Sequence, residues 1–371
     1  MTERVLITGG AGFIGSHLAD NLLRRGVRVR VLDNLDPQVH GDGRRRPRYL
    51  ARDVELLVGD VRDAARVAEA LQGCDAVVHL AAKVGVGQSM YRIEEYTSVN
   101  AAGTAVLLEA LSRRPVGRLV VASSMSVYGE GLYRRGDGQV VEGRRRTLEQ
   151  LRRGFWELSD QDGAPLVPEA TPETKAPCLE SVYALGKYDQ ERMSLLVGQA
   201  YGIPTVALRF FNVYGPRQAL SNPYTGVLAI FAARLLNGNA PLVFEDGEQR
   251  RDFVSVHDVA EACAQALTSS SVDFDVLNIG SGEAHSVREV AERVAKACGR
   301  RIAPEVTRQY RVGDIRHCFA DVSRARERIG YTPRVSFDQG LAELATWLEG
   351  QTAKDSVVEA RAELQARGLA L

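Results

Sequence analysis

The sequence lacks the features that would direct a chain to a membrane, to a metal or out of the cell. It has five cysteines in 371 residues, and none of them stands in a CxxC pair or at zinc-ligand spacing. Scattered single thiols are typical of a reducing compartment, so we expect a cytoplasmic protein without a metal site. No apolar run approaches the ~18 residues that would span a bilayer. No signal-peptide pattern begins the chain, so we expect neither secretion nor membrane insertion.

The sequence also lacks net charge. Lys+Arg and Asp+Glu both number 47, so the field of the whole molecule attracts neither nucleic acid nor an anionic membrane. Arginine triplets at 44–46 and 144–146 are local exceptions. We interpret both as solvated loops in preference to phosphate or partner sites.

What the first half does contain is an alternation of short β-branched runs with segments of helical periodicity. Several runs are apolar on both faces, which is typical of parallel strands covered on both sides. We therefore predict an α/β fold built on a doubly wound parallel sheet. The predicted strands are 5–8, 27–32, 54–58, 76–79, 118–122 and 205–209, and the predicted helices are 14–25, 64–71, 102–111 and 181–201.

The rest of the chain is less regular. Beyond residue 212, prolines and glycines punctuate shorter elements, which indicates a smaller α/β lobe over 213–350 that completes the site begun by 1–212. Residues 130–180 carry turn signals and arginines, with a weak helical window near 148–156. A loop of this length is usually functional, and we expect a partly ordered insertion over the active site. The tail 351–371 has helical composition and no predicted role.

A glycine-rich loop follows the first predicted strand and begins the first predicted helix. Gly9 permits the tight turn, Gly12 lets the backbone approach a pyrophosphate, and Gly15 lets helix and strand pack closely. The helix N-terminus adds free N–H groups and a positive dipole for phosphates. At the end of the next strand, the Asp33 carboxylate suits both adenosine ribose hydroxyls and repels a 2′-phosphate. The sequence therefore predicts a Rossmann site that prefers NAD to NADP.

Two further segments follow predicted strands, at 59–61 and 80–82. Both fall at carboxyl ends, where a doubly wound sheet binds its ligand. Asp60 suits either an adenine amino group or the N-cap of the helix that follows, and both interpretations stay open.

Tyr183 and Lys187 lie four residues apart on a predicted helix, so both project from one face. A free phenol titrates near ~10. A neighbouring ammonium, together with a positive nicotinamide, favours the phenolate and brings that pKa towards neutrality. Lys187 also suits the nicotinamide ribose. Ser124 ends the fifth strand on the same edge of the sheet, where its hydroxyl can bond the substrate oxygen that Tyr183 deprotonates. Either motif alone is frequent by chance, whereas their combination with the glycine loop is specific.

With these motifs the sequence resembles the extended short-chain dehydrogenases/reductases of the NAD-dependent nucleotide-sugar epimerase/dehydratase family. The resemblance runs from residue 4 to about residue 347. It rests on TGGAGFIG at 8–15, Asp33, GDV at 59–61, HLAA at 79–82, SVN at 98–100, SSMSVYG at 123–129, YALGK at 183–187, LRFFNVYGPRQ at 208–218 and RRDFVSVHDVA at 250–260.

The resemblance implies NAD as cofactor, a nucleotide-diphosphate sugar as substrate and a homodimer formed through the helix at 100–111 and the helix carrying Tyr183. It makes Tyr183 the base, Lys187 the modulator of its pKa and Ser124 the hydroxyl partner. The implied cofactor-binding residues are Gly9, Gly12, Phe13, Ile14, Gly15, Asp33, Asn34, Asp60, Val61, Leu80, Ala81, Ala82, Asn100, Ser123, Tyr183 and Lys187. The implied substrate-binding residues are Ser124, Met125, Asn212, Arg251, Arg311 and Asp314. A guanidinium suits a diphosphate, although Arg251 and Arg311 fit surface ion pairs equally well.

The reaction depends on the two residues that come directly after the hydroxyl residue. Dehydratases of this family carry Asp-Glu there, and the decarboxylases of UDP-glucuronate keep the Glu. This sequence has Met125 and Ser126, and neither moves a proton at neutral pH. We therefore expect an isomerase, a 4-epimerase that oxidises C4, turns the keto sugar and returns the hydride to the other face. Another nucleotide-sugar oxidoreductase or decarboxylase is the alternative, and a non-catalytic NAD sensor is a remote one.

The segments 84–91 and 217–226 and the presence of an insertion are most similar to the dTDP-L-rhamnose 4-epimerase group, followed by UDP-glucose 4-epimerase-like enzymes. Those relatives tend to have cysteines in the insertion, whereas this chain has FWELSDQDG at 155–163. The sugar therefore stays open between dTDP-L-rhamnose, a UDP-hexose, a UDP-hexuronate and an activated heptose.

Overall fold

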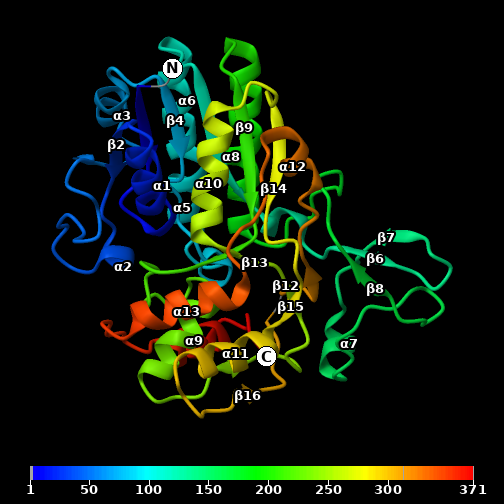
Figure 1. Ribbon diagram of the computed structural model, residues 1–371. Helices are drawn as coiled ribbons and strands as arrows, with labels where there is room; N and C mark the ends of the chain where they lie inside the picture. The colour runs from blue at the N-terminus through cyan, green and yellow to red at the C-terminus, as the bar shows by residue number, and fades with distance from the viewer. Residues whose placement is uncertain (1–2, 312, 371) are drawn as a thin grey trace.

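The computed structural model describes residues 3–311 and 313–370. A seven-stranded sheet forms its centre, and every neighbouring pair of its strands runs parallel. Helices α1 and α10 lie together on one face, and α3, α6 and α8 lie side by side on the other (Figure 1). The predicted doubly wound sheet is confirmed. In order, the strands are β14 (Asp275–Ile279), β9 (Thr205–Phe210), β5 (Arg118–Ser124), β4 (Ala76–His79), β1 (Arg4–Thr8), β2 (Arg28–Asp33) and β3 (Glu55–Val58), and the helices are α1 (Phe13–Arg24), α3 (Ala64–Leu71), α6 (Gly103–Arg113), α8 (Val182–Tyr201) and α10 (Val256–Thr268).

The central strands are apolar on both faces because helices cover both. Val5, Val78, Val120 and Val206 are all fully buried. The chain adds β2 and β3 on one side of β1 and then β4, β5, β9 and β14 on the other side. This reversal leaves a crevice at the carboxyl ends of β1 and β4, where ligands bind in such sheets.

The second lobe lies below the carboxyl edge of the sheet in Figure 1. Its core is formed by residues such as Phe231, Val294 and Leu344. Its main elements are α9 (Val227–Leu236), β11 (Leu242–Val243), α11 (Val287–Ala297), β16 (Glu305–Val306) and α13 (Phe337–Leu348). Short strand pairs join it to the rest of the molecule, and they comprise β10 (Asn212–Tyr214) with β13 (Phe253–Ser255), and β12 (Arg250–Arg251) with β15 (His285–Ser286) and β17 (His317–Cys318).

The predicted boundary at residue 212 does not separate the two parts cleanly. After entering the lobe the chain returns to the sheet with α10, β14 and α12 (Ser323–Ile329). Leu277 and Ile279 of β14 are fully buried in the core that also holds Val5 and Val120. Residue 212 therefore marks where the chain first leaves the sheet, and the sheet takes its seventh strand from the later sequence.

The insertion is an ordered arm beside the molecule. Three strands, β6 (Leu132–Arg134), β7 (Val140–Glu142) and β8 (Val167–Glu169), form an antiparallel sheet, and α7 (Leu148–Arg152) lies beneath it (Figure 1). Tyr133, Leu158 and Leu166 form its own small core. Of residues 130–180, only the last, Glu180, lines the central cavity, so the prediction that the insertion covers the active site is wrong.

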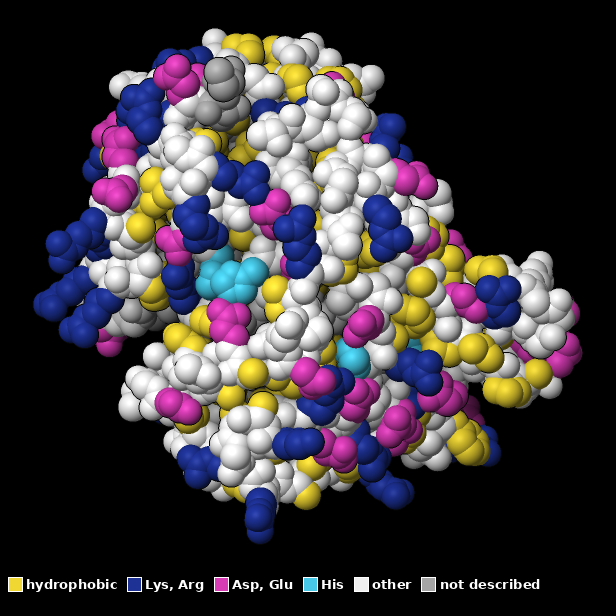
Figure 2. Space-filling view, in the orientation of Figure 1, with side chains coloured by type: hydrophobic (Ala, Val, Ile, Leu, Met, Phe, Trp, Pro, Cys, Tyr) yellow, Lys and Arg dark blue, Asp and Glu magenta, His cyan; other side chains and the backbone are white. Residues whose placement is uncertain are grey.

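The two arginine triplets differ in their exposure to solvent. Arg44, Arg45 and Arg46 are exposed, as predicted, and Figure 2 shows basic side chains gathered on that side of the molecule. In the second triplet Arg146 is 6% exposed and forms a bidentate ion pair with Glu245 of the second lobe, at 2.8 and 2.9 Å. The interpretation of 144–146 as a solvated loop is therefore wrong for Arg146, because this side chain anchors the arm.

The remaining helices are short, apart from one in the tail. These are α2 (Pro37–His40), α4 (Val86–Ser89), α5 (Ile93–Thr97), a π-turn (Ser98–Ala102), a 3₁₀ turn (Met125–Tyr128) and α14 (Val357–Ala366). The tail 351–371, for which the sequence predicts no role, thus forms a helix, and its last residue lies outside the described residues. Within the described ranges, no helix is both long and apolar enough to cross a membrane.

Candidate active site

A cavity of about 660 Å³ lies between the carboxyl edge of the sheet and the second lobe. Every residue that the sequence assigns to cofactor or substrate binding lines it, with the exception of Asn100. A concave site of this size at the reversal of strand order is where a small-molecule ligand is expected.

The glycine loop fits a dinucleotide. Gly9 has φ +68°, and a Cβ there would lie 2.8 Å from the backbone nitrogen of Ala81. A Cβ on Gly15 would lie 2.5 Å from Cα of Gly10, so both positions require glycine for packing. A Cβ on Gly12 would meet only the Gly9 carbonyl, at 3.3 Å, and no side chain caps the helix at this residue. The first N–H groups of α1 are therefore open to a phosphate.

Asp33 is fixed at the cavity wall. One carboxylate oxygen accepts a hydrogen bond from the backbone N–H of Ala11 at 3.0 Å, and the other accepts from Leu35 at 2.9 Å. Nε2 of His40, which the sequence analysis did not single out, lies 3.6 Å from the same carboxylate. A carboxylate has about four acceptor positions, so Asp33 keeps acceptors for ribose hydroxyls.

Asp60 lines the cavity but does not cap the following helix. Its carboxylate accepts from the Arg62 guanidinium at 2.8 Å through each oxygen and from Asn34 at 3.3 Å. The hydrogen bonds from Arg62 lower the pKa of Asp60 to about 2. The side chain of Asp63 caps α3 by accepting from Ala65 and Arg66. The N-cap interpretation of Asp60 is therefore wrong.

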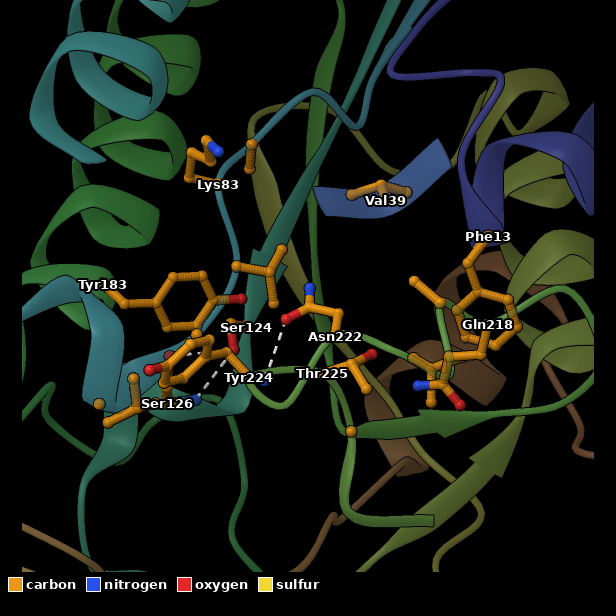
Figure 3. A pocket seen from close by; sticks show the side chains of 18 of the residues that line it. Phe13, Val39, Lys83, Ser124, Ser126, Tyr183, Gln218, Asn222, Tyr224 and Thr225 are labelled. Atoms are coloured by element: carbon orange, nitrogen blue, oxygen red, sulfur yellow. Dashed lines mark hydrogen bonds between the residues drawn. The ribbon is translucent and has the colours of Figure 1, made fainter. Parts of the chain in front are cut away.

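Tyr183 and Ser124 project into the same part of the cavity, from the start of α8 and from the end of β5 (Figure 3). Burial raises the pKa of the Tyr183 phenol, and a hydrogen bond with the Ser124 hydroxyl lowers it in part. Burial also lowers the pKa of Lys187 to about 7, which the negative charge of Glu191 partly opposes. The site thus brings together a phenol, a hydroxyl and an amine that holds its proton weakly.

A buried polar network positions Lys187, and the sequence analysis missed it. Nζ of Lys187 donates to Oε1 of Gln190 at 2.7 Å. The amide nitrogen of Gln190 lies 2.9 Å from the Thr104 hydroxyl and 3.1 Å from Nε2 of His79. Burial and then the Lys187 charge lower the pKa of His79 to about 3, so this imidazole is neutral. Gln190 follows Lys187 by three residues on α8, and that spacing is the one signal the sequence offered.

The two adjacent serines at the end of β5 have different surroundings. The Ser123 hydroxyl donates to Oε2 of Glu191 at 2.6 Å, and Glu191 forms a buried bidentate pair with Arg209 at 2.9 and 2.6 Å. Ser123 therefore ties β5 and β9 to α8. The Ser124 hydroxyl accepts from the Ser126 hydroxyl at 2.9 Å and faces the cavity.

Asn100 is the predicted cofactor residue that the structure keeps away from the cavity. It is fully buried in the π-turn. Its side chain accepts from the backbone N–H of Lys83 at 2.7 Å and donates to the Lys83 carbonyl at 3.1 Å. Asn100 therefore holds the backbone of a segment that does line the cavity, and Lys83 itself pairs with Asp36 at 2.6 Å and Glu95 at 2.7 Å.

The other predicted substrate-binding residues, Met125, Asn212, Arg251, Arg311 and Asp314, line the cavity as well. Arg251 donates to the carbonyls of Arg316 and Ile315 at 2.8 and 2.5 Å. Arg311 pairs with Asp314 at 2.9 Å. Burial alone would raise the pKa of Asp314, but the charges of Arg311 and Arg251 hold it below its usual value.

The segment 218–226 supplies cavity residues that no predicted role covered. Gln218, Asn222, Tyr224 and Thr225 all line the cavity, with Tyr224 next to Tyr183 and Gln218 next to Phe13 (Figure 3). The Tyr224 hydroxyl lies 2.6 Å from that of Tyr91, so this segment contacts the one after β4. In the sequence these residues contribute only to the resemblance to relatives.

Comparison with known proteins agrees with this geometry. The model of the NAD dependent epimerase/dehydratase family matches residues 5–280. The chain is 36% identical to a dTDP-L-rhamnose 4-epimerase of Burkholderia thailandensis, over 93% of this chain and 95% of the relative. It is 31% identical to a UDP-N-acetyl-alpha-D-glucosaminuronate decarboxylase of Bacillus cytotoxicus, over 94% and 98%. The crystal structure of a Thermus thermophilus UDP-glucose 4-epimerase in complex with NAD superposes with a TM-score of 0.74 at 34% identity, over 94% of this chain and 100% of that one. The chain therefore belongs to the NAD dependent epimerase/dehydratase family.

Proposed function

We propose that the protein is an NAD-dependent nucleotide-sugar 4-epimerase, with dTDP-L-rhamnose as the first candidate substrate. The observation that carries this proposal is the wall formed by Tyr183, Ser124 and Lys187, next to Met125 and Ser126 in place of a further acid and base. The names of the relatives, among them a dTDP-L-rhamnose 4-epimerase and a UDP-glucose 4-epimerase, support it.

The residues present fit the cofactor. The N–H groups that begin α1 at Gly12 would hold the pyrophosphate, Asp33 the adenosine ribose and Lys187 the nicotinamide ribose. When bound, NAD accepts and returns a hydride, and its positive ring adds to the Lys187 charge in favour of the Tyr183 phenolate.

In the proposed reaction Tyr183 removes the proton from the C4 hydroxyl of the sugar while the hydride leaves C4. The Ser124 hydroxyl bonds the same oxygen as it becomes a carbonyl. The keto sugar then turns its other face, the hydride returns to C4, and Tyr183 returns the proton to the oxygen. The hydride returns to C4 on the opposite face and the proton returns to the same oxygen, so the overall reaction inverts C4 and is redox-neutral.

The surroundings of Ser124 support epimerisation over the alternatives. Met125 is 8% exposed and apolar, and the Ser126 hydroxyl bonds Ser124. Glu180 also lines the cavity, and Nε of Arg145 lies 3.5 Å from its carboxylate. A 4,6-dehydratase needs an acid and a base beside the keto sugar, and Met125 and Ser126 stand at the positions where the dehydratases carry them. A net oxidoreductase or decarboxylase, for example on UDP-glucuronate, is the alternative, and a non-catalytic NAD sensor is a remote one.

We also propose that the protein is a homodimer that acts in cytoplasmic carbohydrate biosynthesis. The dimer would form through α8 and α6, since Leu185 and Leu196 of α8 are 47% and 59% exposed. The five cysteines carry free thiols, which suits a reducing compartment. Light scattering of the purified protein tests the dimer, and cell fractionation tests the location.

The experiment that tests the function is incubation with a panel of nucleotide sugars, with dTDP-L-rhamnose first. Proton NMR follows the sugar while absorbance follows reduced nicotinamide in the same tube. We expect a C4 epimer of unchanged mass and no accumulating NADH. Stoichiometric NADH, or a product lighter by water or carbon dioxide, would establish an alternative instead.

A further inference from the structure

The C-terminal segment, residues 351–370, closes one side of the cavity. Val357, Ala360, Arg361 and Leu364 of α14 all line it, and Leu369 lines it beyond the helix. The first four are spaced as one face of a helix. Neither the motifs of the sequence nor the proposed function assigns this segment a role.

The segment is anchored before its helix begins. Asp355 accepts from Nη1 of Arg234 at 3.2 Å and from Nδ2 of Asn239 at 2.8 Å, at the end of α9. The backbone N–H of Lys354 donates to the Ser221 hydroxyl at 3.1 Å. Both carboxylate and guanidinium of the Arg234–Asp355 pair are less than one-tenth exposed, so the start of the segment is fixed to the second lobe.

The helix then spans the cavity from one wall to the other. Towards the sheet, a Cβ on Gly87 would lie only 3.3 Å from Leu364, and the Arg367 guanidinium stacks over Tyr91 at 4.4 Å. Towards the second lobe, Nη2 of Arg361 donates to Oε1 of Gln309 at 2.5 Å. Beyond the helix, Ala370 forms a β-bridge with Arg311. The segment therefore contacts both the wall that follows β4 and the loop that carries Arg311 and Asp314.

Arg361 is the charged residue that this helix presents to the cavity. Its Nε is buried and has no hydrogen-bond partner among the described residues. The Gln309 amide to which it bonds is neutral, and none of the ion pairs between described side chains includes Arg361. Arg251 and Arg311 line the same cavity, with Asp314 as the carboxylate that both approach. Arg251 and Arg311 thus have a carboxylate beside them, whereas Arg361 has none among the described side chains, and an anionic ligand would supply its counter-charge.

We propose that Arg361 binds the diphosphate of the nucleotide sugar, and that the C-terminal segment is thereby part of the substrate site. The ligand class rests on the proposed function, whereas the contacts of Arg361 do not depend on it. Arg361 is far along the chain from the catalytic motifs, and it contributes to binding of the nucleoside diphosphate and not to the chemical step. Loss of Arg361 therefore weakens binding of the substrate and binding of the transition state equally.

The test is isothermal titration calorimetry of the full-length protein, loaded with NAD, with dTDP and with UDP as probes. We expect Arg361→Ala to weaken binding of the preferred nucleoside diphosphate at least about tenfold, which corresponds to about 1.4 kcal/mol. Arg361→Lys keeps the charge and should recover part of this loss. Arg326→Ala removes one exposed arginine of α12 and should leave the affinity unchanged. NAD content and thermal midpoint show that each variant is folded.

Gln309→Ala separates direct contact from tethering. It removes the partner of Arg361 and keeps the guanidinium, so we expect a loss of less than about threefold. Unchanged affinity in Arg361→Ala, equal losses in Gln309→Ala and Arg361→Ala, or no binding of either probe to the unmodified protein would each overturn the proposal. Because the probes carry no sugar, the outcome does not depend on epimerisation. An epimerase with unchanged Arg361→Ala binding would contradict only this inference, and tenfold weaker binding without epimerisation would contradict only the function.

Discussion

Lys187 has an unusual position for an ammonium, because it is 3% exposed and forms a direct hydrogen bond only to the neutral Gln190 amide among the described residues. Removal from water without an ion pair disfavours the charged form. The pKa of about 7 that results places the proton of Lys187 in the pH range where the enzyme would work. A bound dinucleotide and a Tyr183 phenolate would restore the charged form, so cofactor binding and base activation are coupled through this residue.

The stability of the NAD-free protein should report this pKa. An unfolded lysine titrates near ~10.4, so between about pH 7 and that value the unfolded chain holds a proton that the folded chain has released. Stability therefore rises with pH across this window by up to about 1.4 kcal/mol per pH unit, and the contribution is lost as pH falls through the folded pKa. Urea unfolding from about pH 7 to pH 9 should show this slope for the wild type and not for Lys187→Met. Parallel curves would contradict it.

Tyr183→Phe should remove the base and leave the site otherwise intact. We expect kcat to fall by about 10²–10⁴-fold, as is usual for loss of a general base. NAD content should stay at the wild-type level, since the aromatic ring remains and only the hydroxyl is lost. Tyr201→Phe is a matched control on the same helix, where the side chain is 53% exposed, and it should have full activity. Retained activity in Tyr183→Phe would mean that another group moves the proton.

Gly12→Ala tests the dinucleotide site separately from the fold. The added Cβ meets only one atom of the chain within 4 Å, the Gly9 carbonyl oxygen at 3.3 Å, so a small shift of the loop accommodates it, while it adds bulk where the backbone would approach a pyrophosphate. We expect NAD binding to weaken at least about tenfold, with an unchanged thermal midpoint of the NAD-free protein. The control is Gly136→Ala, where a Cβ meets nothing within 4 Å. Wild-type NAD affinity in Gly12→Ala would contradict the assignment.

Among the elements, the arm at 130–180 depends on buried ion pairs with the second lobe. Arg316 is fully buried and contacts Glu157 of the arm at 2.5 Å together with Glu245 at 3.0 Å and Asp246 at 2.7 Å. A buried charge that loses its partner is much more costly than an exposed one.

Arg316→Met should therefore destabilise the protein by up to about 3 kcal/mol, because Glu157 and Asp246 lose the guanidinium that they share and Glu245 keeps only its pair with Arg146. The measurement is chemical denaturation at neutral pH. Arg134→Ala removes an exposed pair with Glu169 on the same arm and should leave the midpoint unchanged. A similar small effect in both variants would show that the arm is held by its apolar contacts.

At this scale the sequence predicted the elements that have local signals. The strand at 76–79 and the helix at 64–71 have the predicted bounds, because β-branched runs and helical periodicity are properties of short segments. The strand β14 was not predicted, since five residues after an irregular stretch have no distinctive pattern. The direction of the arm could not be predicted from local patterns either, because Arg146 and Glu245 pair across 99 residues of sequence.

For the whole molecule, the parts of the site that were predicted have local sequence patterns, and the parts that were missed depend on contacts between distant segments. Strand ends and helix starts meet at one edge of a parallel sheet, so Gly12, Asp33, Ser124 and Tyr183 could be brought together from sequence. The polar partners of Lys187 and the cavity face of α14 depend on how distant segments pack. Arg361 lies on a helix whose composition gives no sign that it contacts a ligand.

Reversible oxidation at C4 of a nucleotide sugar can be followed with a substrate that carries deuterium at C4. The panel of nucleotide sugars identifies that substrate, and dTDP-L-rhamnose is the first to label. In ordinary water we expect a C4 epimer that keeps its deuterium at C4, with unchanged mass and no free NADH, since the hydride leaves and returns without exchange. A product that has lost the deuterium, water or carbon dioxide, or that forms with one equivalent of NADH, would contradict it.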